Sequence, residues 1–142
     1  MINIMQAAKF LVYLSYQNNK YSLTPLKLQK LLYIAQGWSY VWDGYELFPN
    51  QFEAWQYGPV NLDVYHHFKK YGRDEIPEKE GVSSIHNIEA EETLKSIWSR
   101  FGSWNAFQLV EYTHSQAPWI EAYANDGIIK NSDIKKYYQS KY

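Results

Sequence analysis

The chain has 142 residues, a formal net charge of −1 and no cysteine. This length suits one domain with a sizeable hydrophobic core, and the lack of cysteine excludes disulfides and thiolate metal sites. Tyrosine and tryptophan are abundant, with 14 Tyr and 6 Trp, and both side chains suit interfaces as well as cores because they keep a polar group.

The N-terminal segment predicts an amphipathic helix. Asn3 is a candidate N-cap and Gln6 follows three residues later, as in a capping box. Apolar residues then recur at helical spacing: Ile4, Ala7, Ala8, Leu11 and Leu14. We expect the helix to fray within residues 17–22. The segment lacks a basic n-region, and no apolar run approaches the roughly 20 residues of a membrane span, so we expect a cytoplasmic protein.

A second helix is predicted over residues 25–42. Thr24 is its candidate N-cap, Pro25 occupies the first helical position, and Gly44 ends it. One stripe is apolar: Leu28, Leu31, Leu32, Ala35 and Trp38. Gly37 lies in the middle of this helix, where glycine costs up to about 1 kcal/mol relative to alanine. Close packing of another element against Gly37 is a reasonable cause.

Residues 45–57 change from helical to extended spacing. Two short extended pieces, around residues 45–48 and 52–57, flank Pro49-Asn50, which predicts a hairpin or a tight loop. In the second piece, alternation separates Phe52 and Ala54 from Trp55 and Tyr57. One face of this strand can therefore pack in the core while the other reaches the surface, before Gly58-Pro59 turns the chain.

The second half of the chain is predicted to be mostly helical. After residue 59 the expected inner face of a helix is Val60, Val64, Tyr65 and Phe68, with Gly72 at its end. Residues 73–86 predict the loop of lowest order. Further helices are predicted over residues 89–101, from a Ser103 cap to residue 113, from Pro118 to residue 124, and over residues 132–139, with a turn at 125–127.

The predicted fold is therefore mainly α. We expect residues 1–142 to form one compact domain of six to seven helices with one small β-hairpin near residues 45–57. Inside the fourth helix, the residues expected to face inward are Leu94, Ile97, Trp98 and Phe101, and Gly102 is expected to close it.

Charge is unevenly distributed along the chain. Residues 1–42 contain no acidic residue, and their basic residues are Lys9, Lys20, Lys27 and Lys30. Residues 73–92 hold seven acidic residues against two basic ones. A bipolar surface can orient a charged partner, whereas solvated faces and a mobile loop are the simpler explanation.

The sequence contains no phosphate-binding loop, dinucleotide fingerprint or G-x-S-x-G motif. His66 and His67 are adjacent, so on a helix they point about 100° apart and cannot share one ion. Asp63 and His67 are spaced by four residues and form a weak metal-binding pair without a third ligand. We expect no metal ion, no cofactor and no enzymatic activity.

His114 lies where one predicted helix ends and Pro118-Trp119 begins the next. A histidine near a helix C-terminus interacts favourably with the last carbonyl groups. A catalytic base would need a partner, for which Glu111 or Ser115 are the candidates. The structural role is favoured because the spacing demands neither partner.

A winged helix-turn-helix outline is a further alternative. Two helices joined by a short turn, with Lys27 and Lys30 at the start of the second helix and a hairpin behind, fit this outline. Arginine occurs only twice in the chain, however, and phosphate contacts need cationic groups. DNA binding is thus weakly indicated.

Three sequence blocks occur in order between residues 24 and 122. The first is Lys27, Leu28, Lys30, Leu31, Leu32 and Tyr33. The second is Phe52, Ala54, Trp55, Tyr57, Gly58 and Pro59, and the third is Thr113-His114 with Pro118-Trp119. Together they closely resemble the Panacea antitoxin domain, also described as GepA-like or SocA-like.

The resemblance implies a small antitoxin that is encoded beside a toxin and neutralises it by direct protein contact. Such domains pair with unrelated toxins, including small alarmone-synthetase-like enzymes that pyrophosphorylate tRNA, and one branch delivers its toxin to a protease instead. Some relatives carry an added DNA-binding domain, for which this chain is too short. We therefore expect a stand-alone protein that occludes the toxin's active or nucleotide site, with neither nucleic acid nor membrane as a partner.

The expected toxin-binding surface combines residues from the three blocks. It contains the strand and corner at Trp55, Tyr57 and Pro59, the exposed edge of Gln29 and Tyr33, and neighbouring His114 and Trp119. The acidic segment 73–92 is a second candidate, because a cationic tRNA-handling toxin would attract it. Delivery to a protease and DNA-binding regulation remain the alternatives.

Overall fold

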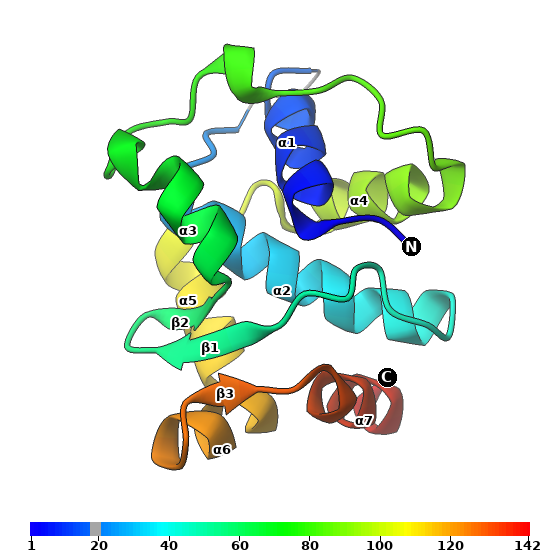
Figure 1. Cartoon of the computed structure of the whole chain (residues 1–142), viewed down its shortest axis with the longest axis vertical. Helices are drawn as coiled ribbons and strands as arrows, with labels where there is room; N and C mark the ends of the chain where they lie inside the picture. Colours follow the sequence, from blue (N-terminus) through cyan, green and yellow to red (C-terminus); the bar gives the residue numbers. More distant parts are fainter. Residues whose placement is uncertain (18–20) are drawn as a thin grey trace.

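A computed structural model describes residues 1–17 and 21–142. This part of the chain forms a mainly helical domain with seven α-helices, two 3₁₀ turns and a small sheet (Figure 1), which confirms the predicted fold class. The helices are α1 (Ile4–Ser15), α2 (Pro25–Trp42), α3 (Leu62–Phe68), α4 (Ile88–Phe101), α5 (Ala106–His114), α6 (Ala117–Ala124) and α7 (Asn131–Lys141). The 3₁₀ turns are η1 (Lys69–Tyr71) and η2 (Glu78–Glu80), and the strands are β1 (Phe52–Trp55), β2 (Gly58–Val60) and β3 (Ile128–Ile129).

Helix α2 is the centre of the fold. It runs through the middle of the molecule, with α1 and α4 on one side and α7 on the other (Figure 1). Residues 27–37 are all buried, so α2 is covered around its whole circumference and not only along the predicted stripe. A helix in this position is expected to be apolar on every side, yet Lys27, Gln29 and Lys30 belong to its buried residues.

The beginnings of the first two helices follow from local capping. The Asn3 side chain accepts a hydrogen bond from the helix, and Gln6 completes the capping box as predicted. Thr24 caps α2, and Pro25 stands at its first position. Part of the segment predicted to fray, residues 18–20, lies outside the described residues.

Gly37 lies where the Tyr138 ring of α7 packs against α2, which confirms the expected close approach.

The hairpin lies further along the chain than predicted. Strand β1 pairs antiparallel with β2, with Ala54 opposite Pro59, and the two strands are joined by a tight turn at Gln56-Tyr57. Strand β3 pairs with the other edge of β1, which gives the sheet order β2-β1-β3. Of the two alternatives predicted for Pro49-Asn50, the hairpin is therefore wrong.

Residues 45–48 are not a strand because a side chain of α2 takes their backbone hydrogen bonds. The Gln36 amide nitrogen donates to Phe48 O at 2.7 Å, and the backbone N–H of Leu47 donates to Gln36 Oε1 at 2.9 Å. Both Leu47 and Phe48 are buried. The apolar spacing of this segment thus reflects its packing under α2 and not a β ladder.

Other element ends differ by a few residues from the prediction. Asn105, not Ser103, caps α5 and forms a second capping box with Gln108. Val60 belongs to β2, and Tyr65 points outward with 38% of its surface exposed, so the predicted inner face of α3 is correct only for Val64 and Phe68. The four predicted inner residues of α4 are buried, and Gly102 is its C-cap.

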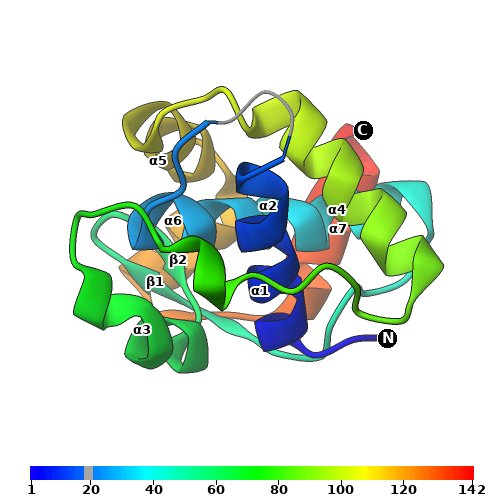
Figure 2. The ribbon, with the colours of Figure 1, turned by 90° about the horizontal axis from the view of Figure 1, so that it is seen from above.

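The segment between α3 and α4 wraps over α1 and is attached to the domain at several points (Figure 2). Ile76 and Ile85 are buried, and the Tyr16 hydroxyl donates a hydrogen bond to Ile76 O at 2.6 Å. The backbone N–H of Val82 donates to Lys9 O. Although the segment contains no α-helix, as predicted, these contacts tie it to the core.

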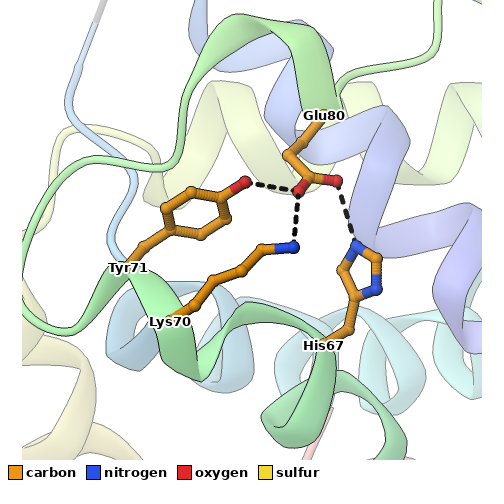
Figure 3. Close-up of polar contacts among 4 residues, drawn as sticks. All are labelled: His67, Lys70, Tyr71 and Glu80. Atoms are coloured by element: carbon orange, nitrogen blue, oxygen red, sulfur yellow. Dashed lines mark hydrogen bonds and ion pairs between the residues drawn. The ribbon is translucent and has the colours of Figure 1, made fainter.

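Glu80 forms the main polar anchor of this segment (Figure 3). Its carboxylate accepts hydrogen bonds from Tyr71 at 2.6 Å and His67 Nε2 at 3.0 Å, and Lys70 Nζ lies 3.8 Å away. Burial alone would raise the pKa of Glu80, but the hydrogen bonds from Tyr71 and His67 outweigh it and hold the pKa below its ordinary value.

We expect Glu80→Gln to lower the free energy of unfolding at pH 7 by about 1–2 kcal/mol, because hydrogen bonds to a charged group are lost. Since the folded-state pKa of Glu80 is lowered, its contribution is present above the unfolded-state pKa and is lost as pH falls through the folded-state pKa. Urea unfolding at pH 7 and pH 3 measures this difference. Exposed Glu92→Gln is the matched control, expected within about 0.5 kcal/mol of wild type; an equal loss there would contradict the anchor.

No helix in residues 1–17 or 21–142 combines the length and the hydropathy needed to cross a membrane.

Candidate functional site

The predicted partner-binding residues gather around the β1–β2 turn, but they differ in exposure. Tyr57 at the tip of the turn is 57% exposed, and Trp55, His114 and Trp119 are half-buried beside it. Gln29, Tyr33 and Pro59 are buried. The predicted exposed edge of Gln29 and Tyr33 is therefore wrong.

Side chains on α2, α5 and α6 donate hydrogen bonds to the backbone carbonyl oxygens of residues 55–61. These bonds are Trp119 Nε1 to Trp55 O (2.9 Å), His114 Nε2 to Gln56 O (2.9 Å), Lys30 Nζ to Pro59 O (2.8 Å) and Gln29 Nε2 to Asn61 O (3.0 Å). We call this set the carbonyl clamp. A turn held in this way loses little freedom on binding, which is how preorganisation raises affinity.

The buried members of the candidate set hold the turn and do not present a surface. The backbone N–H of Asn61 donates to Gln29 Oε1 at 2.9 Å, so Gln29 pairs with Asn61 in both directions. The Tyr33 hydroxyl donates to Gln116 Oε1 at 2.9 Å just before α6, and the Tyr33 ring meets Phe52 edge to face. These contacts connect α2 with the sheet and α6.

His114 is a structural member of the clamp. Its ring stacks on Trp119 at a centroid distance of 4.0 Å, and Trp119 in turn stacks on Tyr123 at 4.7 Å. A carbonyl only accepts hydrogen bonds, so His114 Nε2 acts as the donor to Gln56 O. Ser115 donates to Tyr112 O, not to His114.

A metal-binding cluster is absent from the described part of the chain. In residues 1–17 and 21–142, no group of three or more His, Asp or Glu side chains is arranged to hold an ion. His67, which the sequence paired with Asp63, bonds Glu80 on the neighbouring segment instead.

Lys30 is fully buried, and its ammonium nitrogen contacts the Pro59 carbonyl. Burial lowers the pKa of Lys30 to about 7. A Cβ atom at residue 58 would lie 2.7 Å from Lys30 Cε, and Gly58 has a φ of +105°. Both the close approach and the left-handed backbone therefore require glycine at this position.

Lys27 is also buried, and its Nζ donates to Gly102 O at 2.5 Å beneath the Trp98 ring. Burial lowers the pKa of Lys27 to about 8. The basic edge proposed for DNA from Lys27 and Lys30 is thus wrong, because neither ammonium group faces solvent. Lys20 lies outside the described residues.

A group of exposed basic residues lies on and beside α7, at the end of the molecule opposite the acidic segment (Figure 1). Its exposed lysines are Lys130, Lys135, Lys136 and Lys141. Other exposed basic residues lie elsewhere, among them Lys70, Arg73 and Lys95, and exposed Asp133 lies on α7 itself. The exposed basic residues are therefore not confined to one half of the domain, and within residues 1–42 Lys27 and Lys30 are buried.

An apolar groove of about 450 Å³ opens between the start of α2, the β1–β2 turn and α3 with η1. It is lined by Pro25, Leu26, Gln29, Trp55, Gln56, Tyr57, Val60, Val64, Tyr65, Phe68, Lys69 and Gly72. The sequence pattern gave no sign of Leu26 and placed Tyr65 on an inner helix face, whereas Tyr65 packs edge to face against Trp55 with a centroid distance of 4.9 Å. The outward alternation of Trp55 and Tyr57 was the one sequence signal for this groove.

Comparison with known proteins agrees with the three sequence blocks. A family model described as antitoxin SocA-like, Panacea domain, matches residues 28–120, a range that contains every donor of the carbonyl clamp. Antitoxin SocA of Caulobacter vibrioides (strain NA1000 / CB15N) is 35% identical over 109 residues, which cover 68% of this chain and 58% of SocA. The chain thus spans less than two thirds of that relative's length.

No solved structure gives a significant match to the domain. The family model covers more than half of the chain and includes the β1–β2 hairpin and most of α2. The chain therefore belongs to the SocA-like Panacea domain family.

Proposed function

We propose that this protein is an antitoxin that neutralises a cognate protein toxin by binding it directly. The proposal is supported by its membership of a family described as antitoxin SocA-like and by its similarity to a relative named antitoxin SocA. In this proposal the toxin is encoded by an adjacent gene, and the bound antitoxin occludes its active or nucleotide site. A small alarmone-synthetase-like enzyme is the toxin class that we propose to test first.

The observation that carries the proposal is an exposed aromatic turn on a backbone held by the carbonyl clamp. Tyr57 at its tip is exposed, and Trp55 and Trp119 are half-buried on either side. Tyrosine and tryptophan dominate the binding energy of many protein interfaces. Because the clamp already fixes the backbone of the turn, little conformational freedom is lost on association, and this favours a stable complex.

The acidic segment, residues 73–92, would raise the rate of association with a cationic toxin. Residues 73–92 hold seven acidic and two basic residues, and most of their acidic side chains are exposed. A cationic toxin that handles tRNA would be attracted to this segment, which raises the association rate at low salt.

Equimolar purified protein is expected to abolish the activity of the adjacent gene's product without any other component. If the toxin stays fully active, the proposal is wrong; if neutralisation requires an added protease, occlusion is wrong and delivery is supported. The purified pair therefore separates the two mechanisms.

Tyr57→Ala is expected to raise the dissociation constant of the complex at least tenfold, because it removes an exposed aromatic side chain at the tip of the turn. Its free energy of unfolding should stay within about 0.5 kcal/mol of wild type. Titration calorimetry and urea unfolding measure the two quantities. Phe107→Ala is the matched control, because Phe107 is also aromatic and 79% exposed in the first turn of α5, outside both the groove and the acidic segment 73–92. Equal affinity of the Tyr57→Ala variant and wild type would remove the turn from the interface.

A further inference from the structure

The apolar groove beside the β1–β2 turn has the chemistry of a docking site for one kind of protein segment. We propose that it receives an apolar side chain of the toxin that is flanked by a carboxylate, an inference that rests on the proposed function and names where the toxin inserts. The walls, the charge and the rigidity of the groove each support this assignment.

The walls of the groove are almost entirely apolar. Val60, Val64 and Phe68 are buried at its base, whereas Leu26 and Tyr65 are 37% and 38% exposed at its edge. An apolar side chain inserted here removes both its own surface and these edges from water, which favours binding. A volume of about 450 Å³ accommodates more than one large side chain, as successive anchors of an amphipathic helix require.

The groove offers little to a small polar ligand. Such ligands are held by a few convergent polar groups within an apolar pocket. The amide of Gln29 is already paired in both directions with the backbone of Asn61. Apolar anchors of a protein segment therefore fit the groove better than a polar metabolite.

Charge sets the second requirement for the occupant. Among the lining residues, all of which lie in the described part of the chain, Lys69 is the charged one. Its side chain is exposed and forms no ion pair within residues 1–17 and 21–142. A carboxylate next to the inserted anchor would complement Lys69 and fix the orientation of the segment.

The walls are held in place before any partner binds. The carbonyl clamp fixes the β1–β2 turn on one side. On the other side, Asn61 Oδ1 accepts from Val64 N at 3.1 Å and caps α3, while Asn61 Nδ2 donates to Gln51 O at 2.8 Å. The groove is therefore preformed, and docking needs no rearrangement of the backbone.

Two substitutions test the groove against the purified product of the adjacent gene. Leu26→Glu places a charge in the apolar wall and is expected to raise the dissociation constant at least thirtyfold. Lys69→Glu removes the complementary charge and is expected to raise it about fivefold, with a smaller effect at high salt. Phe107→Glu and Lys135→Glu make the same changes at exposed positions outside both the groove and the acidic segment 73–92 and should change the dissociation constant less than twofold.

The outcomes separate this inference from the proposed function. If wild-type protein does not neutralise the toxin, the proposed function fails and the toxin is not the occupant. If wild type neutralises and both groove variants bind equally well, only the groove assignment is overturned. Lys69→Glu alters an exposed side chain, so its result stands even if Leu26→Glu fails to fold.

The groove can also be tested with 8-anilinonaphthalene-1-sulfonate, an aromatic anion that has the proposed chemistry. We expect one fluorescent site that weakens at least fivefold in Leu26→Glu and Lys69→Glu, is unchanged in Phe107→Glu, and is displaced by the toxin. Retention of the dye in the toxin complex would overturn the proposal. Sedimentation gives a second way to overturn it. If wild type is a homodimer, and Leu26→Glu makes it monomeric without weakening toxin binding, the occupant of the groove is a second copy of this chain.

Discussion

Gly37→Ala is expected to lower the free energy of unfolding by about 2 kcal/mol, although alanine is the better helix former. Helix propensity alone would favour alanine by up to about 1 kcal/mol. A Cβ atom at this position, however, would lie 2.4–2.6 Å from ring atoms of Tyr138. Tyr138 is fully buried against Tyr33 and Trp38, so its ring cannot move aside and α7 must shift. Overpacking of this kind costs about 1–3 kcal/mol or more.

Urea unfolding of single and double variants measures this clash. In a Tyr138→Leu background the ring is absent, so adding Gly37→Ala should cost much less or become favourable. Ser99→Ala, at an exposed position of α4, reports the gain in helix propensity without a packing change. A Gly37→Ala variant as stable as the Ser99→Ala variant would show that α7 does not pack closely on α2.

The parts of the fold that sequence analysis predicted well depend on local interactions. The capping box at Asn3, the Thr24 cap and the end of α4 at Gly102 are each decided within one helical turn. Gly37 could also be interpreted, because glycine destabilises a helix interior relative to alanine and its presence there indicates a packing requirement. That reason, the Tyr138 ring, lies about a hundred residues away, and the sequence indicated only that some element approaches.

The errors arose where distant groups satisfy local polar atoms. Residues 45–48 read as extended, but the side chain of Gln36 takes the hydrogen bonds that a partner strand would have supplied. Strand β3 has two residues, Ile128 and Ile129, which are too few to show the alternation of apolar and polar residues that predicts a strand. Neither the Gln36 contact nor the pairing of β3 can be derived from spacing alone.

In the candidate site, too, local features were predicted correctly and contacts with distant groups were not. Alternation correctly separated Trp55 and Tyr57 from the buried Phe52 and Ala54, because it is a local property of a strand. Gln29 was expected at an exposed edge of the toxin-binding surface, and the DNA-binding alternative placed Lys30 at the surface, yet both bond backbone carbonyls of residues 59–61. A signal for their burial did exist. The unbroken apolar run of residues 31–35 that follows covers every side of a helix.

Because Lys30 is buried, the protein is expected to become more stable as pH rises from about 7 to about 10. Burial lowers the pKa of Lys30 from 10.5 to about 7. Between these values the unfolded chain holds the proton and the folded chain does not, so the free energy of unfolding increases with pH. The slope approaches about 1.4 kcal/mol per pH unit, and the gain between pH 7 and pH 10 is about 3 kcal/mol.

Other groups limit the window in which this effect can be measured. Burial lowers the pKa of Lys27 to about 8, so Lys27 contributes in the same direction over a narrower range. Burial raises the pKa values of Tyr33 and Tyr138 well above 10. Above pH 10 the unfolded chain loses these phenolic protons first, and stability falls again. Unfolding should therefore be compared at pH 7, 8.5 and 10.

Lys30→Met isolates the contribution of this lysine, because methionine is similar in length and does not titrate. The stability of wild type relative to the Lys30→Met variant should improve by about 3 kcal/mol between pH 7 and pH 10, whereas exposed Lys135→Met should track wild type throughout. A difference that stays constant with pH would mean that the Lys30 ammonium keeps its proton in the folded state. The deprotonated amine still donates an N–H to Pro59 O, so alkaline pH should strengthen the fold without releasing the turn that carries Tyr57.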